Sequence, residues 1–345
     1  MRWDNIREGA GREAVPALFE RGAVARTFDT PGFRGMTFYE VHAKSVINRV
    51  PDASKVPFRW TINPYRGCSH ACVYCFARNT HTYLDLDAGH DFDSKIVVKV
   101  NAPQLVRKEL AAAKWQGEHI AMGTNVDCYQ RAEGRYRLMP GILAALRDAA
   151  NPFSILTKGT LILRDADLLA EASEITEVGL AVSVGCADED LWRAIEPGTP
   201  SPLRRLAVCA ELAGRRMPCS VLMGPVVPFL SDSPAQLDRT VRLAAEAGAS
   251  SVTPIVLHLR PGAREWFLAW LREHHPRLVP RYRALYGRGA YAPKVYQQQV
   301  AAQVRELAER YRVGRGSQHR GHRPARAAAG PAGSAPAEPV QLSLL

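Results

Sequence analysis

Short apolar segments alternate with longer amphipathic ones through the middle of this 345-residue chain. Seven of the short segments have the alternation or the β-branched content of a strand; they lie at 58–63, 95–100, 119–123, 153–156, 178–184, 218–223 and 251–257. Helical patterns follow them at 103–115, 140–150, 165–172, from 201 onward and at 233–248. Strands that alternate with helices predict a parallel sheet with right-handed crossovers. We therefore expect an α/β fold, a partial (β/α)6-type barrel.

The pattern changes on both sides of this core, which we place at 58–259. Residues 1–57 combine Gly, Pro and charge without sustained periodicity, so we expect an irregular lead-in that packs on the body. Residues 260–313 have helical patterning and predict a helical extension that caps the open side of the barrel. Its core-facing stripe consists of Trp266, Phe267, Trp270 and Leu271. Residues 314–345 contain Gly, Ala, Pro and Arg with hardly any apolar side chain, the composition of a disordered tail.

Polar side chains recur where the predicted strands end. They are Asn101, Asn125, Asp127, Lys158, Ser183 and His258. The carboxyl ends of the strands form the catalytic face of β/α barrels, although strands generally end in polar loops. The repetition around one rim, more than any single residue, predicts a site there.

The chain is basic, with a formal net charge of +11. This charge favours polyanionic partners such as nucleic acid, and it is also typical of a soluble enzyme from a GC-rich, arginine-heavy genome. No apolar run is long enough to span a membrane. The odd cysteine count and the lack of an opening apolar signal segment favour the reducing cytoplasm.

Three of the seven cysteines, Cys68, Cys72 and Cys75, fall within eight residues. Three thiolates at this spacing can wrap one face of a cubic iron–sulfur cluster and leave one iron open, because such a cluster normally takes four Cys ligands. A structural zinc site with His70 or His81 as fourth ligand is an alternative. Zinc sites, however, usually consist of two ligand pairs separated by a longer gap. The other four cysteines are scattered singly, as is typical of small buried apolar residues.

The Cys-x3-Cys-x2-Cys spacing, with Tyr74 just before the third cysteine, resembles the signature of the radical S-adenosylmethionine (SAM) enzymes. The resemblance implies a [4Fe-4S] cluster on the three cysteines, with SAM chelating the open iron. Reductive cleavage of SAM then yields a 5′-deoxyadenosyl radical. It also implies an electron donor such as flavodoxin or ferredoxin.

Further stretches resemble the spore photoproduct lyase-like branch of that family. They are 123–129, Leu156-Thr157-Lys158, Ser183 and 196–206, within a similarity that runs from about 63 to 228. The resemblance implies that Lys158 and Ser183 lie at the SAM site, where a cation can pair with the SAM carboxylate and a hydroxyl can donate a hydrogen bond. Tyr74, Phe76 and Asn125 are the other residues that we expect at the cofactors. For Lys158 the alternative is a solvated surface lysine.

The chain departs from the lyase in one place. The lyase's hydrogen donor is a cysteine immediately before a Ser-Asp pair, whereas this region reads Gly-Thr-Asn-Val-Asp. The nearest cysteine, Cys128, follows the Asp and is a catalytic candidate by proximity only. Arg204 and Arg205 lie early in a predicted helix, where they can meet a substrate anion, pair with Glu196 or be solvated.

We therefore expect a radical SAM enzyme, possibly of lyase type, that acts in DNA repair or nucleic-acid modification. The alternatives are modification of a protein or small molecule, and a non-catalytic zinc-type module that binds nucleic acid. The tail ends in Gln341-Leu342-Ser343-Leu344-Leu345. This segment resembles the short peptide by which bacterial repair and replication proteins dock on the DNA sliding clamp, and Gln341, Leu342, Leu344 and Leu345 would make the contact.

Overall fold

A seven-stranded sheet forms the body of the molecule, in the strand order β12-β11-β10-β9-β8-β5-β4. The computed structural model describes residues 3–4, 22–52, 54 and 56–314. The strands are β4 (Ile47–Arg49), β5 (Trp60–Ile62), β8 (Ile120–Met122), β9 (Phe153–Thr157), β10 (Val178–Ser183), β11 (Cys219–Val226) and β12 (Val252–Val256). All neighbours from β5 to β12 are parallel, and β4 pairs with β5 in the antiparallel sense. The six parallel strands confirm the predicted partial barrel.

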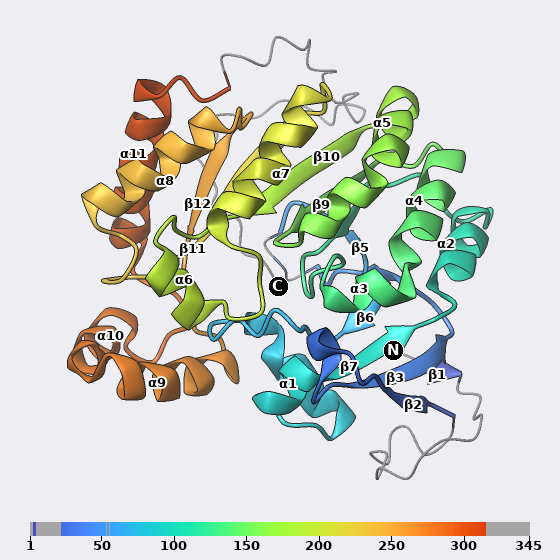
Figure 1. Cartoon of the computed structure of the whole chain (residues 1–345), viewed down its shortest axis with the longest axis horizontal. Coiled ribbons are helices and arrows are strands. Elements are labelled where there is room, and N and C mark those ends of the chain that lie inside the picture. The colour runs from blue at the N-terminus through green and yellow to red at the C-terminus, as the bar shows by residue number, and fades with distance from the viewer. Residues whose placement is uncertain (1–2, 5–21, 53, 55, 315–345) are drawn as a thin grey trace.

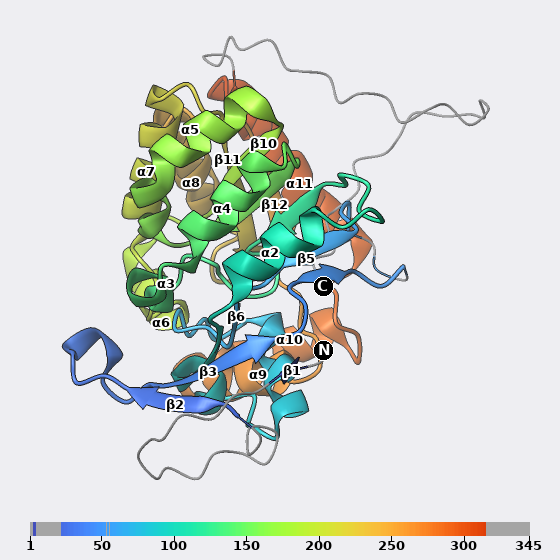
Figure 2. The same ribbon diagram turned by 90° about the vertical axis from the view of Figure 1, so that its right-hand side faces the viewer.

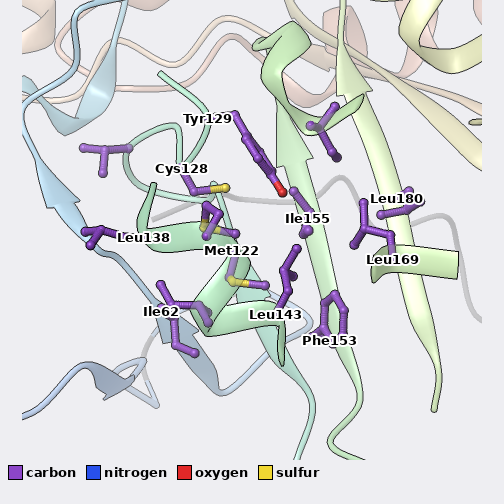
Figure 3. Packing of buried hydrophobic residues seen from close by; sticks show 14 of the residues in the cluster. Ile62, Met122, Cys128, Tyr129, Leu138, Leu143, Phe153, Ile155, Leu169 and Leu180 are labelled. Carbon is purple, nitrogen blue, oxygen red and sulfur yellow. The ribbon is translucent and has the colours of Figure 1, made fainter. Parts of the chain in front are cut away.

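Helices cover the outer face of this sheet (Figure 1). They are α2 (Ala102–Leu110), α4 (Leu138–Asp148), α5 (Ala166–Ile175), α7 (Pro202–Gly214) and α8 (Pro234–Glu246). The Ser201 and Ser233 hydroxyls accept the amide N–H of Arg204 and Gln236, and a proline follows each serine, so these two helices begin as predicted. The apolar faces of helices and sheet pack together in one hydrophobic core (Figure 3).

Short elements connect the strands near their carboxyl ends. They are the 3-10 helices η3 (Phe76–Leu84) and η4 (Thr160–Asp165) and the helices α1 (His90–Ser94), α3 (Arg131–Tyr136) and α6 (Glu189–Ile195). No helix in the described ranges combines the length and apolarity needed to cross a membrane.

A second sheet packs beside the barrel and corrects two expectations. It contains β1 (Trp3–Asp4), β2 (Val24–Thr27), β3 (Thr37–Ala43), β6 (Tyr65–Arg66) and β7 (Lys95–Lys99), and the 3-10 helix η2 (Pro31–Phe33) joins β2 to β3. The expectation of an irregular lead-in is wrong for β1, β2, β3 and β4. The apolar run at 95–100 is not a barrel strand, because β7 pairs in parallel with β3. Asn101 accordingly lies away from the rim, where its amide holds the N–H and C=O of Ala43 at 2.9 Å each.

The C-terminal segment is helical, and we name it the cap. It comprises α9 (Ala263–His274), η5 (Pro276–Leu278), α10 (Val279–Tyr286) and α11 (Lys294–Arg310). Of the predicted apolar stripe, Phe267, Trp270 and Leu271 are buried, and Trp266 is half-buried. The Tyr282 and Tyr286 hydroxyls donate to the carbonyls of Pro228 (2.6 Å) and Leu257 (2.7 Å). These bonds fix α10 to the segments that follow β11 and β12, and the side view shows α9 and α10 together at one end of the molecule (Figure 2).

Candidate active site

A cavity of about 140 Å³ opens at the carboxyl ends of the parallel strands. One wall is the cysteine loop, with Cys68, Cys72 and Cys75. The other walls are 123–127 after β8, 156–158 after β9, Ser183 at the end of β10, and parts of 222–225 and 255–258 in and after β11 and β12. All the rim residues predicted from the sequence line this cavity, except Asn101. Tyr74 and Phe76 line it too.

Buried polar side chains hold the cysteine loop in place. The Gln130 side chain accepts the Ser69 N–H and donates to the Gly67 carbonyl, both at 2.9 Å. Arg78, which is fully buried, donates to the Cys72 carbonyl from Nε (3.2 Å) and Nη2 (3.0 Å) and pairs with Asp93 at 2.9 Å. These contacts satisfy backbone groups that have no partner within a regular helix or sheet. The loop therefore presents its cysteines from a rigid frame.

The segment Glu196-Pro197-Gly198, which follows α6, packs directly on this loop. The N–H of Gly198 donates to the His70 carbonyl at 3.1 Å, and that of Val73 to the Ile195 carbonyl at 3.0 Å. A Cβ on Gly198 would lie 2.1 Å from the Ser69 carbonyl oxygen. Only glycine permits this approach, which explains why the chain has one here.

The three cysteines fit an iron–sulfur cluster. Burial raises the pKa of all three thiols, for Cys72 to about 12, so a bare thiolate is disfavoured there. A cationic cluster would supply the charge that stabilises deprotonated ligands. Three protein thiolates leave one iron of a [4Fe-4S] cluster open.

A zinc site fits less well. Over the described ranges, no group of three or more His, Cys, Asp or Glu side chains is placed to hold a single metal ion. His81 lies with Nε2 2.8 Å from the Lys95 carbonyl oxygen, and Nδ1 of His70 lies 3.4 Å from Asp127. One ring nitrogen of each histidine is therefore already in contact with a protein group, and the other nitrogen of His81, Nδ1, is buried without a hydrogen-bond partner.

Lys158 extends into the cavity. Its Nζ donates to Ser183 Oγ at 2.8 Å, and the Ser183 hydroxyl donates to the Gly224 carbonyl at 2.9 Å. The Lys158 side chain is only 16% exposed, so it is not the solvated surface lysine of the alternative. The cation and the hydroxyl lie side by side in one cavity, as a site for an amino-acid carboxylate requires.

Behind Lys158 lies Glu196, whose central place the sequence did not reveal. Its carboxylate accepts hydrogen bonds from the Tyr74 hydroxyl and from Arg205, and lies 4.0 Å from Lys158 Nζ. Arg205 is buried and also donates to the Ser183 carbonyl at 2.8 Å. Burial alone would raise the pKa of Glu196, but the charges of Arg205 and Lys158 outweigh it and hold that pKa below its ordinary value. Of the three roles expected for Arg205, the structure shows the ion pair with Glu196.

Asp127 joins the β8 and β9 ends at the cavity floor. It accepts hydrogen bonds from Thr157 Oγ1 and the Lys158 N–H, both at 2.6 Å, and from the Tyr129 N–H at 2.9 Å. Burial acts to raise the pKa of Asp127, but His70 and the donors from Thr157 and Lys158 lower it to about 2. The carboxylate thus stays charged and fixes the backbone that carries Lys158. Asn125, two residues earlier, lines the cavity beside it.

Cys128 does not reach the cavity. Its side chain is fully buried in the apolar core, near Ile62, Met122 and Leu138 (Figure 3). Burial raises the pKa of this thiol well above its ordinary value. The tight turn that points Asp127 into the cavity sends the next residue inward. The expectation of Cys128 as a catalytic residue is therefore not supported by its position.

Comparison with known proteins agrees with this site. The family model of the radical SAM superfamily matches residues 62–244. An uncharacterized protein of Mycobacterium tuberculosis (strain ATCC 25618 / H37Rv) is 49% identical over 300 residues, which cover 87% of this chain and 88% of that protein. An uncharacterized protein of Methanocaldococcus jannaschii is 32% identical over 195 residues, covering 56% and 69%.

Solved structures with a similar fold include two of spore photoproduct lyase. The lyase complexed with dinucleoside spore photoproduct has a TM-score of 0.60 at 16% identity and covers 80% of each chain. A lyase variant with bound AdoMet and the same dinucleoside has a TM-score of 0.57 at 16% identity and covers 76% of this chain and 77% of its own. The match of the superfamily model over more than half of the chain, on a barrel with three cysteines at its cavity, shows that this chain belongs to the radical SAM superfamily, whose enzymes use a [4Fe-4S] cluster and SAM.

Proposed function

We propose that this radical SAM enzyme acts on nucleic acid, in a DNA repair reaction of the lyase type. The observation that carries the proposal is the division of the cavity into two chemically different walls. The charged wall has Lys158 and Ser183 beside the cysteines, and the apolar wall has Leu222, Ile255 and Leu257. The first suits the amino-acid part of SAM, and the second suits a base or sugar held away from water.

The residues of the charged wall have separate tasks. Cys68, Cys72 and Cys75 would hold the cluster. Lys158 would pair with the SAM carboxylate, and the Ser183 hydroxyl would share that contact. When bound, the cluster supplies one electron and SAM supplies the 5′-deoxyadenosyl group that abstracts a hydrogen atom.

Glu196 sets the charge of this wall. Two cations, Arg205 and Lys158, face the single carboxylate of Glu196, so one positive charge remains for the SAM carboxylate. The Tyr74 hydroxyl donates to the same carboxylate and so ties this arrangement to the residue before Cys75. Binding of SAM and placement of the cluster are thereby linked through the chain's own side chains.

Two further features support nucleic acid as the substrate. The net charge of +11 favours a polyanion, and the fold resembles that of a lyase crystallised with a dinucleoside photoproduct. Because Cys128 lies in the core, a hydrogen atom given back to the substrate would come from a group other than this thiol. An electron donor such as flavodoxin or ferredoxin and the sliding clamp complete the proposed set of partners; the clamp peptide lies outside the described residues.

The test uses anaerobically reconstituted protein, dithionite, SAM and UV-irradiated DNA. We expect 5′-deoxyadenosine and a loss of photolesions, both measured by mass spectrometry. Undamaged DNA and the Lys158→Ala variant are the matched controls. Cleavage of SAM with every photolesion unchanged would refute repair of UV damage, leave the radical SAM chemistry intact, and point to a protein or small molecule.

A further inference from the structure

The C-terminal cap contains most of the net positive charge of the chain. Residues 260–313 hold eleven Arg and Lys against four Glu, a net +7 of the chain's +11. No carboxylate side chain occurs between Glu273 and Glu306, a stretch that includes α10. The arginines between Glu273 and Glu306 are Arg277, Arg281, Arg283, Arg288 and Arg305. The charged side chains of this segment are therefore all cationic, and the carboxylate that reaches it from another element, Asp232, accepts a hydrogen bond from the Tyr296 hydroxyl.

The way in which α10 is anchored determines where these charges point. The helix buries Tyr282 and Tyr286 against the ends of β11 and β12. Arg277, Arg283 and Arg288 are consequently exposed. None of these three has an ion-pair partner among the side chains that the structure describes. In the described part of the chain, these three charges therefore face solvent rather than a paired carboxylate.

This surface borders the cavity. Phe76 and His258 line the cavity, and the ring of Tyr291 packs edge-on against His258 at 4.6 Å. The Arg260 guanidinium lies 5.9 Å from the ring centres of both Phe76 and Tyr291. Tyr291, at the end of the loop 287–291, thus packs on a residue of the cavity lining.

Arg264 makes that loop rigid, since it donates to the carbonyls of Gly287 (2.5 Å) and Gly289 (2.7 Å) on either side of Arg288. Two perpendicular views place α9 and α10 together at one end of the molecule (Figures 1 and 2), and in Figure 1 α1 lies beside α9. Arg288 is therefore presented from a fixed loop, three residues before the half-exposed Tyr291 at the rim.

We propose that Arg277, Arg281, Arg283 and Arg288, here named the basic cap surface, bind the sugar–phosphate backbone of a nucleic acid whose target nucleotide enters the cavity. This rests on the proposed function and adds the site of docking. Arginine forks match phosphate oxygens and release counterions from the polyanion. The exposed Tyr291 ring offers a platform for a base next to the cavity.

The experiment compares two triple variants of the full-length holoprotein. One is Arg277→Gln with Arg283→Gln and Arg288→Gln; Arg281 is kept because its guanidinium lies 3.9 Å over Phe229. The matched control replaces three exposed cations that lie in or just after α2 and α7, do not line the cavity, and have no ion-pair partner in the described part. They are Lys108, Lys114 and Arg216, each changed to Gln.

Binding of a labelled, undamaged DNA duplex is measured by anisotropy over a series of salt concentrations. For the cap variant we expect affinity about tenfold or more below wild type and a salt slope smaller by about two to three, because each lost phosphate contact removes about 0.9 from that slope. The control should bind as wild type does. Both variants should cleave SAM at the wild-type rate without DNA, which shows that fold and cofactor site are intact.

Wild-type DNA affinity in the cap variant, or an equal loss in both variants, would overturn the proposal. Loss of binding to phosphatidylglycerol vesicles with DNA binding unchanged would likewise overturn it, in favour of a membrane surface. The result is independent of repair: if wild type leaves UV lesions unchanged and the cap variant still loses DNA affinity, docking stands and the repair reaction fails.

Discussion

The Glu196→Gln substitution should destabilise the protein strongly, since it removes the one negative charge between two cations. Glu196 is 3% exposed and accepts hydrogen bonds from Tyr74 and Arg205. The amide oxygen can still accept one of these bonds. It cannot balance the guanidinium of Arg205, which is 1% exposed. The variant therefore contains a buried cation without its counter-charge.

The size of the effect follows from this burial. Removing one partner of a buried ion pair costs about 3–5 kcal/mol, against a total free energy of unfolding of about 5–15 kcal/mol for a typical protein. The pair itself need not be stabilising, because both ions are desolvated. Adding Arg205→Met to Glu196→Gln should therefore restore much of the loss, to within about 2 kcal/mol of wild type.

Urea unfolding under anaerobic conditions measures the free energy of unfolding of wild type, Glu196→Gln, Arg205→Met and the double variant. Equal m values are expected for all four proteins. The pKa of Glu196 is held below its ordinary value. The contribution of its charge is thus complete above the ordinary carboxyl pKa and is lost as the pH falls through the lower folded-state pKa. The difference between wild type and Glu196→Gln should stay constant above about pH 5 and shrink in stronger acid. A single variant within about 1 kcal/mol of wild type, or a double variant no more stable than the worse single one, would refute this reasoning.

Four further predictions concern the cysteines, SAM binding and the tail. Alanine in place of any one of the three cavity cysteines should abolish cluster binding, measured as iron content and visible absorbance, whereas Cys209→Ala should retain both the iron and SAM cleavage. Lys158→Ala should keep the cluster and weaken SAM binding about ten- to a hundredfold, from the loss of a charge-assisted contact of about 1.5–3 kcal/mol; an unchanged dissociation constant in calorimetry would exclude that contact. Cys128→Ser should cleave SAM as wild type does and be less stable by about 1–3 kcal/mol, because a hydroxyl enters an apolar core. Loss of turnover in a folded variant would show that the Cys128 thiol takes part in catalysis. A peptide of residues 337–345 should bind the sliding clamp of the same organism in calorimetry, and binding that survives replacement of Gln341 and Leu344 by Ala would remove the tail from the case for repair.

Local signals in the sequence were sufficient for the barrel and for the cysteine loop. Alternation of strand and helix patterns depends on neighbouring residues, so the parallel strands β8 to β12 were predicted close to their observed bounds. The cysteine spacing has the same local character. Polar residues at strand ends, such as Lys158 and Ser183, met at one cavity because parallel strands bring their carboxyl ends together.

Partner choice between distant segments was decided by tertiary structure alone. The run at 95–100 has a strand pattern, but periodicity does not tell which sheet it joins, and it pairs with β3. The inward turn of Cys128 and the burial of Glu196 between Arg205 and Lys158 likewise depend on the backbone around them. A sequence pattern records which residues are apolar or charged, whereas the direction of a side chain and the solvent around it are set only when remote elements pack together.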